Sequence, residues 1–307
     1  MAINWGLARK RKALLARAEI IRQIRRFFHD EGYLEVETPL RIPAPAPELH
    51  IDAIPSGEWY LHTSPELTMK RLLAAGCERI YQICRCWRDG ERGRFHIPEF
   101  TMLEWYRADA DYLSLMDECE ELISSITQAI GLGDTISYQG HRIALGGKWE
   151  RITVEESFHR FTKYSMEEAL QVSLFDELMT TKIEPFLGVK APAFIQDYPA
   201  SKGALAKLKA DNHKIAERFE LYIGGLEIAN AFSELIDPVE QSARFTNEQE
   251  IRRSMGKRVY PMPERFLEEL PHMTPSAGIA LGLDRLVMVL LDASSIDEVV
   301  AFTPEEL

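Results

Sequence analysis

Residues 79–107, RIYQICRCWRDGERGRFHIPEFTMLEWYR, decide the fold of this 307-residue chain. They contain two runs rich in aromatic and β-branched residues, 79–88 and 99–107, joined by a polar loop that contains glycine. This arrangement is typical of two β-strands that pair as a hairpin. Because side chains alternate across a strand, the second run places aromatic rings, a carboxylate and a phenol on one face. That face carries Phe100, Met102, Glu104 and Tyr106.

Patterns on both sides of this hairpin extend it into a larger sheet with helices. Apolar residues recur at helical spacing over 11–30, and Gly32 follows as a stop signal. Further strands are expected at 33–37, 59–61, 194–198, 216–223, 226–232 and 278–281, and further helices at 65–75, 111–130, 238–255, 264–270 and from Gly282 onward. We therefore expect an α+β fold around a mainly antiparallel sheet flanked by helices. Residues 1–307 are expected to form one domain, with an insertion at about 137–192.

The composition limits the classes of function. A net charge of -12 argues against broad affinity for nucleic acid, since phosphate binding depends on Lys and Arg. The apolar runs fall far short of the roughly 20 residues that span a bilayer, and no signal-peptide pattern opens the chain. The 4 cysteines are too sparse for a disulfide scaffold, so a cytoplasmic location is expected. Cys84 and Cys86 would share one face of a strand, either as buried thiols or in a redox or metal role.

A second expected hairpin carries two acids. Gly224-Gly225 is a turn signal between two strand-like runs. A two-residue turn pairs Tyr222 with Glu227, and it places Glu220 diagonally from Glu227 on the same face, about 7 Å or less apart at Cβ. Two carboxylates in this position can share Mg²⁺, which prefers a few oxygen ligands beside substrate phosphates. The alternative is a solvated acidic face.

Two stretches resemble the ATP-binding motifs of class II aminoacyl-tRNA synthetases. Arg88 to Phe100 resembles motif 2, and Gly282-Leu283-Asp284-Arg285, which follows an expected strand and opens an expected helix, resembles motif 3. A third stretch, 32–39, resembles motif 1, which forms the dimer interface in that family. The resemblance covers residues 11–302. It implies the class II catalytic core, a homodimer and the activation of an amino acid as its adenylate.

The resemblance assigns nucleotide binding to residues of both ATP motifs. Arg88 matches the arginine that clamps the α-phosphate, and Arg285 matches the arginine that covers adenine and touches the terminal phosphates, so these two are the expected catalytic residues. The full expected ATP-binding set is Arg88, Asp89, Gly90, His96, Ile97, Phe100, Glu227, Ile228, Gly282 and Arg285. Two positions depart from the family, because relatives usually carry glutamate at Gly90 and asparagine at Ile97.

The segment 227–235 resembles the family's signature for a lysine-like substrate. Glu234, with Glu66 and Tyr106 nearby, is expected to meet the substrate ammonium, because a buried cation requires opposite charge. Alternatively, Glu66 caps the helix 65–75. The full expected substrate-binding set is Ser64, Pro65, Glu66, Glu104, Tyr106, Asn230, Phe232, Glu234 and Ala280.

The same segment cannot be a regular strand if all of its polar residues face the pocket. Asn230, Phe232 and Glu234 share one parity, whereas Glu227 has the other. We therefore predict a β-bulge between Glu227 and Asn230, which turns both sets of side chains into the pocket.

Two positions and one absence narrow the resemblance to lysyl-tRNA synthetase-like enzymes that attach β-lysine to elongation factor P. Ser64 stands where tRNA-charging enzymes usually have alanine, and Ala280 stands where they have glycine. The added hydroxyl and methyl reshape the site around the substrate α-carbon, a change that typically discriminates by about 1–3 kcal/mol. The chain also begins within a few residues of the motif-1 helix, so no anticodon-binding domain is expected and tRNA is not the expected partner.

The implied activity is the ATP-dependent activation of (R)-β-lysine, with Mg²⁺, and its transfer to a lysine ε-amine of elongation factor P. One alternative is a truncated enzyme that charges tRNA or activates α-lysine. A catalytically silent regulatory paralogue would be expected to lose Arg88, Arg285 or the Glu227 and Glu234 pair, and all of these are present. An amide synthetase that uses ammonia would not keep the acids expected to bind the ammonium group.

Overall fold

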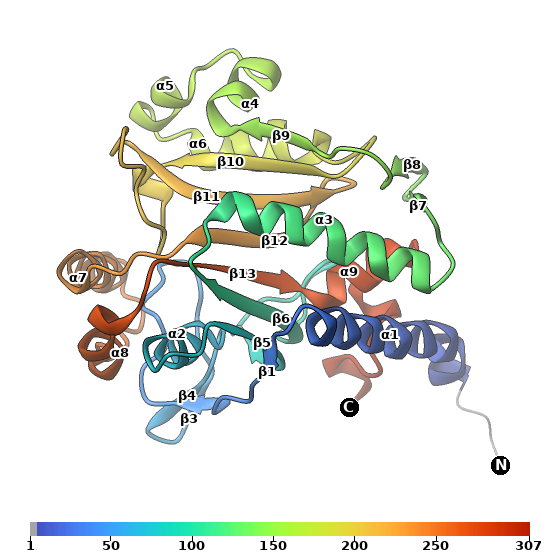
Figure 1. Ribbon diagram of the computed structural model, residues 1–307, viewed down its shortest axis with the longest axis horizontal. Coiled ribbons are helices and arrows are strands. Elements are labelled where there is room, and N and C mark those ends of the chain that lie inside the picture. Colours follow the sequence, from blue (N-terminus) through green and yellow to red (C-terminus); the bar gives the residue numbers. More distant parts are fainter. Residues whose placement is uncertain (1–4) are drawn as a thin grey trace.

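An eight-stranded sheet forms the centre of the molecule (Figure 1), which a computed structural model describes over residues 5–307. The inner strands run antiparallel, and only the two edge strands pair in parallel with their neighbours. In spatial order the strands are β1 (Leu34–Glu35), β5 (Arg79–Trp87), β6 (Glu99–Ala108), β13 (Ser276–Gly282), β12 (Leu226–Ser233), β11 (Ile215–Ile223), β10 (Ala193–Pro199) and β9 (Glu150–Thr153). The expected α+β fold with a mainly antiparallel sheet is confirmed.

Helices cover one face of this sheet, and other helices close one end of its second face. α1, α3 and α9 pack on the first face, and α2, α7 and α8 gather beside the second face (Figure 1). The helices are α1 (Trp5–Asp30), α2 (Glu66–Ala74), α3 (Tyr112–Ala129), α4 (Val154–Phe161), α5 (Met166–Gln171), α6 (Phe175–Leu178), α7 (Pro238–Ser254), α8 (Glu264–Glu269) and α9 (Leu283–Leu290). Short 3-10 or π turns are η1 (Met179–Ile183), η2 (Glu184–Phe186), η3 (Ala200–Lys202), η4 (Leu270–His272), η5 (Ile296–Glu298) and η6 (Pro304–Glu306).

The alternation of side chains along β6 separates the core from the polar face. Leu103 and Trp105 are fully buried among the helices of the first face. The Trp105 ring lies 5.3 Å from the ring of Phe28 in α1, in an edge-to-face arrangement that aromatic pairs prefer. The residues that alternate with them, Glu104 and Tyr106, point to the second face. This alternation leaves the second face free to hold a polar site.

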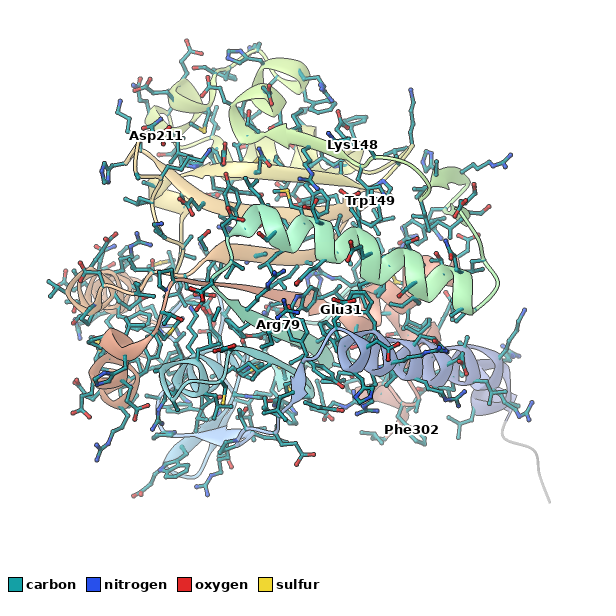
Figure 2. All side chains as sticks on the ribbon, viewed as in Figure 1. Glu31, Arg79, Lys148, Trp149, Asp211 and Phe302 are labelled. Atoms are coloured by element: carbon teal, nitrogen blue, oxygen red, sulfur yellow. The ribbon has the colours of Figure 1, made fainter. Side chains whose placement is uncertain are left out.

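The end of α1 is fixed against the start of β5. The chain turns at Gly32, whose φ of 74° is a conformation that glycine adopts without strain. Arg79 donates a hydrogen bond to the carbonyl of Glu31 at 2.9 Å, and Figure 2 shows these two residues close together. Beyond the turn, only Leu34–Glu35 pairs with β5, so the strand expected at 33–37 is shorter than the sequence predicted. The helix expected at 11–30 begins earlier, at Trp5.

The segment 137–192, expected as an insertion, extends the sheet and adds a third hydrophobic cluster. β9 pairs in parallel with β10 at the edge of the sheet. Around it, α4, α5 and α6 bury residues such as Phe158 and Phe175, whose rings stack at 5.1 Å. Two small sheets complete the fold, formed by β2 (Arg41–Ile42), β4 (Trp59–Leu61) and β3 (Pro55–Ser56) and by β7 (Thr135–Tyr138) and β8 (His141–Ala144). The division into one domain with an insertion stays a prediction.

The helices of the described part of the chain are all too short or too polar to cross a membrane. The longest, α1, has 26 residues and includes many basic and acidic side chains.

Candidate active site

A cavity of about 390 Å³ lies over the second face of the sheet. Residues that face one another across neighbouring strands form its floor. One row consists, from β11 to β5, of Glu220, Asn230, Ala280, Glu104 and Gln82. A parallel row consists of Arg218, Phe232, Gly278 and Tyr106. Apart from Gln82, all of these residues line the cavity. The rows join segments that are far apart in the sequence.

Glu104 is an enclosed acid at the centre of the floor. It is 1% exposed, and it accepts hydrogen bonds from the hydroxyls of Ser64 at 2.8 Å and Tyr106 at 2.6 Å. Burial, followed by repulsion from Glu66, raises the pKa of Glu104 to about 8. Hydrogen bonds alone therefore do not keep this carboxyl ionised at neutral pH, and a cation beside it would favour the charged form.

A buried lysine, Lys70 of α2, joins the two acids expected at the substrate ammonium. Its Nζ lies 2.6 Å from Glu66 Oε1 and forms an ion pair with Glu234. In the described part of the chain, Glu234 Oε1 has no hydrogen-bond partner, and it lies beside Gly278. A Cβ at Gly278 would come within 2.4 Å of that oxygen and 2.2 Å of the Tyr106 ring, so only glycine fits there.

The contacts of Glu66 bear on its two expected roles. At the N-terminus of α2 the Glu66 N–H donates to the hydroxyl of Ser64 at 3.0 Å, while Glu66 itself lies in the first turn. It lines the cavity, and its carboxylate bonds to Lys70.

Arg88 stands at the other end of the cavity. Its backbone N–H donates to the carbonyl of Pro98 at 2.9 Å, which fixes the base of the motif-2 loop. Its guanidinium lies 5.1 Å from the centre of the Phe100 ring and 3.8 Å from the carboxylate of Glu91. Its Nε is buried and has no hydrogen-bond partner among residues 5–307. Arg88 therefore offers an unpaired donor beside an aromatic ring.

Arg285, at the start of α9, spans the hairpin and the motif-2 loop. It donates to the carbonyl of Glu227 at 3.0 Å and to its carboxylate at 3.2 Å. Its Nη2 lies 2.6 Å from Nε2 of His96. Burial and then the charge of Arg285 lower the pKa of His96, so a neutral imidazole accepts this bond. Motif 3 thus contacts the motif-2 loop through Arg285 and His96.

The hairpin of β11 and β12 contains the predicted bulge. Leu221 faces Ala229, and the next residue, Tyr222, faces Glu227, so Ile228 is the additional residue on β12. The expected bulge between residues 227 and 230 is confirmed, and so is the two-residue turn at residues 224 and 225. Glu220 lies opposite Asn230, and both of them line the cavity with Glu227.

Glu220 and Glu227 each have an arginine partner. Glu220 accepts hydrogen bonds from Arg218 at 2.6 Å and from two tyrosine hydroxyls, while Glu227 pairs with Arg285. A third acid, Glu184 of η2, is close enough to be affected: burial and then the charges of Glu220 and Glu227 raise the pKa of Glu184 to about 7. Three acids thus gather at this end of the hairpin.

Most of the residues expected from the sequence line this one cavity. They are Ser64, Glu66, Arg88, His96, Ile97, Phe100, Glu104, Tyr106, Glu220, Glu227, Ile228, Asn230, Phe232, Ala280, Gly282 and Arg285. Pro65, Asp89, Gly90 and Glu234 are not among the lining residues. Asp89 and Gly90 line a separate hollow. The Asp89 N–H donates a hydrogen bond to the Asp52 carbonyl at 2.7 Å, and this bond holds their part of the loop away from the cavity.

Four residues near the site were not expected from the sequence: Glu48, Lys70, Glu184 and Arg218. Lys70 follows Glu66 by four residues on an expected helix, and this spacing is a signal for an ion pair. Arg218 precedes Glu220 by two residues on an expected strand, which places both on one face. Glu48 and Glu184 lie outside the segments with regular periodicity, so no spacing signal indicates them.

Comparisons with known proteins agree with this geometry. Residues 4–306 match the family described as tRNA synthetases class II (D, K and N). The chain is 39% identical over 321 residues to the elongation factor P–(R)-β-lysine ligase of Hamiltonella defensa, covering 99% of this chain and 98% of that protein. It is 39% identical to the ligases of the same name from Salmonella gallinarum and Edwardsiella ictaluri, covering 98% of this chain and 97% of each of them. The chain therefore belongs to the class II tRNA synthetases (D, K and N), in the group of the elongation factor P–(R)-β-lysine ligases.

Proposed function

We propose that this protein is a ligase that activates (R)-β-lysine with ATP and transfers it to a lysine ε-amine of elongation factor P. The name and full-length similarity of the relatives support this assignment. The structural observation that supports this function best is a single cavity with acidic side chains at one end and two arginines at the other.

The acidic end of the cavity suits a substrate with two ammonium groups. Burial raises the pKa of Glu48 to about 7 and that of Glu104 to about 8, and in both cases the charge of Glu66 adds to the shift. Three acids therefore share a small buried space, where Lys70 pairs with only one of them, Glu66. A cationic substrate would relieve this repulsion and hold the carboxylates ionised. β-Lysine carries two such cations.

Named residues take distinct roles at the substrate in this proposal. Glu104, Tyr106 and Ser64 form one hydrogen-bonded group that receives an amino group of the substrate. Glu66 and the free Oε1 of Glu234 receive the other. Pro65, Asn230, Phe232 and Ala280 complete the expected substrate pocket, in which Asn230 and Ala280 extend the floor beside Glu104.

ATP is proposed to bind at the arginine end of the cavity. Arg88 would turn from the Phe100 ring towards the α-phosphate, so that the ring stacks on adenine, and Arg285 and His96 would contact adenine and the outer phosphates. Ile97, Ile228 and Gly282 complete the proposed nucleotide site, and the loop that carries Asp89 and Gly90 would have to move from its separate hollow to join it. The unpaired Nε of Arg88 supports its role, because an anion would satisfy that buried donor.

The donor set fits Mg²⁺. Glu220 and Glu227 offer hard oxygen ligands, and Glu184 lies close enough for the charges of both to add to the effect of burial on its pKa. Mg²⁺ would be held by Glu220 and Glu227, where it would neutralise phosphate charge. Glu220 would have to exchange some of its present hydrogen bonds for the metal.

The proposed reaction has two steps. A carboxylate oxygen of the substrate forms a bond to the α-phosphorus as the bond to pyrophosphate breaks, and Arg88 and Arg285 stabilise the charge on the phosphate oxygens. The ε-amine of the acceptor lysine then attacks the carbonyl carbon of the mixed anhydride. AMP leaves with the electrons of the broken C–O bond, and the proton of the amine passes to solvent.

A homodimer in the cytoplasm is part of this proposal. The motif-1 resemblance lies on α1 and β1, where Leu15 and Leu34 are 58% and 56% exposed. β1 is also an edge strand of the large sheet. Exposed apolar side chains on and near an unpaired edge strand favour contact with another chain, so they support a dimer interface here. All four cysteines are free, which is typical of a reducing compartment.

Exchange of pyrophosphate into ATP tests the first step, and label transfer tests the second. The protein should support exchange with (R)-β-lysine more efficiently than with α-lysine, and labelled β-lysine should appear on elongation factor P. Arg88→Ala should lower the exchange rate by about 100-fold or more. Arg85→Ala, an exposed arginine on β5 three residues before Arg88, is the matched control and should leave the rate unchanged. Label on tRNA alone would contradict the proposal.

A further inference from the structure

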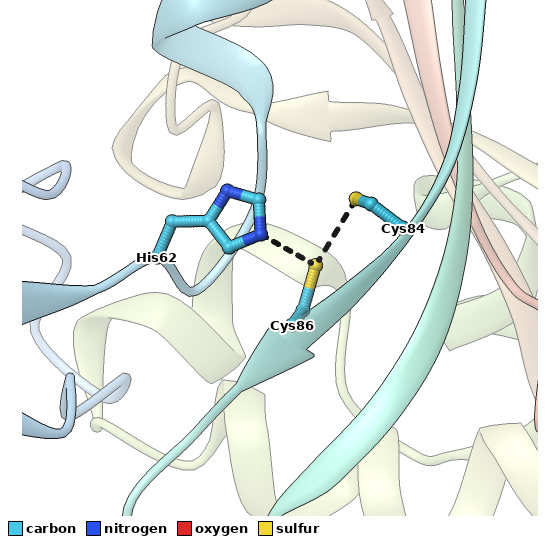
Figure 3. A group of neighbouring side chains, drawn as sticks. All are labelled: His62, Cys84 and Cys86. Atoms are coloured by element: carbon cyan, nitrogen blue, oxygen red, sulfur yellow. Dashed lines mark hydrogen bonds between the residues drawn. The ribbon is translucent and has the colours of Figure 1, made fainter. Parts of the chain in front are cut away.

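A cluster of soft metal-binding groups lies beside the cavity without lining it. The side chains of His62, Cys84 and Cys86 converge, and their ligand atoms all lie within 4.8 Å of one another (Figure 3). The two sulfur atoms are 3.9 Å apart, and the Cys86 sulfur lies 3.8 Å from Nε2 of His62. His62 and Cys86 are buried, and Cys84 is half-buried. The mechanism proposed above uses none of these three residues.

The fold holds these three groups in place before any ligand arrives. Cys84 and Cys86 occupy alternate positions of β5, so both point to its second face. His62 follows β4, and its carbonyl accepts a hydrogen bond from the Trp87 N–H at 3.0 Å. Its own N–H donates to the Leu40 carbonyl at 2.9 Å. The backbone bonds therefore fix the histidine opposite the two thiols.

Two of the three ligand separations fit tetrahedral coordination. With zinc–sulfur bonds of about 2.3 Å and zinc–nitrogen bonds of about 2.0–2.1 Å, two sulfur ligands lie about 3.8 Å apart and a sulfur and a nitrogen about 3.6 Å apart. The observed separations of 3.9 Å and 3.8 Å differ from these values by only a few tenths of an ångström. Thiolates and imidazole are also the ligands that select zinc over magnesium or calcium.

Two buried polar atoms without partners border the cluster. Among residues 5–307, neither Nδ1 of His62 nor Oε1 of Gln82 has a hydrogen-bond partner, and the Gln82 side chain also hydrogen-bonds to Cys84. Nε2 of His62 donates to the Arg85 carbonyl at 2.6 Å when no metal is bound. Coordination would replace this bond and move the ring proton to Nδ1.

A disulfide is a poorer explanation of the same pair. Residues two apart in a strand have Cα atoms about 6.6–6.8 Å apart, from a rise of 3.3–3.4 Å per residue. This is the upper limit of the range for disulfides, which prefer about 5.5–6 Å. A metal ion bridges the observed separation without moving the strand.

We propose that His62, Cys84 and Cys86 form a zinc site with three protein ligands and one open position. Its location joins two walls of the cavity. Cys86 on β5 lies two residues before Arg88 and pairs with Phe100 on β6, while His62 lies two residues before Ser64. Zinc would therefore tie the strand that leads to the motif-2 arginine to the segment that leads to α2.

Cobalt and zinc titrations of the full-length protein, freed of metal with a chelator, test this site. Co²⁺ should produce the thiolate-to-cobalt charge-transfer band with one ion per chain, and Zn²⁺ should displace it and raise Tm. Cys84→Ser with Cys86→Ser should remove the band and weaken zinc binding by more than about 100-fold. His62→Gln should weaken binding as well.

The two remaining cysteines provide the matched control. Cys77→Ser with Cys119→Ser removes the same number of thiols outside the cluster, and this variant should bind like the wild type. Equal binding by the two double variants would overturn the proposal. So would the absence of a thiolate band in wild-type protein, a result that does not depend on how well any variant folds. A Cys84–Cys86 disulfide in protein purified without added reductant or chelator would count against the site too.

Discussion

Glu104 holds a proton at neutral pH in the ligand-free protein, because burial raises its pKa to about 8 from an ordinary value of 4.5. Between these values the folded protein binds a proton that the unfolded chain has released, so stability falls as pH rises through this window. Glu104→Gln lacks this ionisation. Its Tm should exceed that of the wild type by roughly 2–4 °C at pH 9 but not at pH 4, in thermal scans at both pH values.

The same variant should lose activity where it gains stability. Without a carboxylate to pair with the substrate ammonium, kcat/KM for (R)-β-lysine should fall by about 10- to 100-fold in pyrophosphate exchange. Glu99→Gln, at an exposed position of the same strand, is the control for removing one acid. If Glu104→Gln behaved like this control in both measurements, the proposal that Glu104 binds the substrate ammonium would be wrong.

Ala280 is the residue at which substrate choice can be tested. Its methyl group lies in the floor between Asn230 and Glu104. Ala280→Gly opens this part of the pocket, so the ratio of kcat/KM for (R)-β-lysine to that for α-lysine should fall by about 10-fold or more. The ratio is measured by pyrophosphate exchange with each isomer.

Ala277→Gly separates this effect from a general weakening of the strand. Ala277 lies on the same strand β13, but it is fully buried in the core of the first face. Both substitutions remove one methyl from a strand, and only the first does so in the pocket. An unchanged ratio in Ala280→Gly, or an equal change in both variants, would remove Ala280 as a determinant of specificity.

Individual residues were predictable where parity or a motif fixes them. Glu104 and Tyr106 follow from alternation along β6, and Arg88 and Arg285 from the resemblance to motifs 2 and 3. The partner of Glu234 was not predicted, because a lysine on another element had to reach it. Lys70 does so from α2, across a distance in sequence that no local pattern encodes.

At the scale of elements, Lys70 fastens α2 to Glu234, the residue that directly follows β12. Its side chain and that of Glu234 are both fully buried in their ion pair. Lys70→Met leaves Glu234 as a buried charge without a counterion, so the free energy of unfolding should fall by about 3–5 kcal/mol. Denaturation with urea, followed by fluorescence, measures this change.

The neighbouring residue supplies the control for this ion pair. Arg71 pairs with Glu269 on the outside of α2, where the two side chains are 40% and 37% exposed. Arg71→Met should cost less than about 1 kcal/mol. Lys70→Met combined with Glu234→Gln should recover part of the loss, and an equal cost in the single and double variants would show that the pair contributes little.

Helices and strands were predictable where one pattern of apolar residues continues over many positions. Short elements were harder to predict. The strands expected at 194–198, 216–223 and 226–232 match β10, β11 and β12 to within one residue at each end. The bulge was predictable because two sets of polar residues had opposite parity. β9 was missed, since its 4 residues gain their stability only from pairing with β10.

At the scale of the whole molecule, the proposed dimer can be tested at its exposed leucines. Leu34 lies on the edge strand and is 56% exposed. Leu34→Glu places a charge there, which an apolar interface would have to bury at high cost. The variant should sediment as a monomer at concentrations where the wild type is a dimer.

An exposed apolar residue elsewhere controls for the added charge. Val172 is 55% exposed and follows α5, far in sequence from α1 and β1. Val172→Glu should leave the sedimentation of the protein unchanged. A monomeric wild type, or two variants that sediment alike, would rule out an interface centred on Leu34.

The cross-strand row under the cavity has a consequence for synthesis of the protein. Its members come from five strands, and the arginine that closes the nucleotide end lies at residue 285 of 307. No stretch of nascent chain released early from the ribosome contains a complete floor, and the non-local contacts that build it form slowly. A reactive acyl-adenylate can therefore be made only after residue 285 has been translated. By then the complete cavity, which protects the adenylate from water, can form as well.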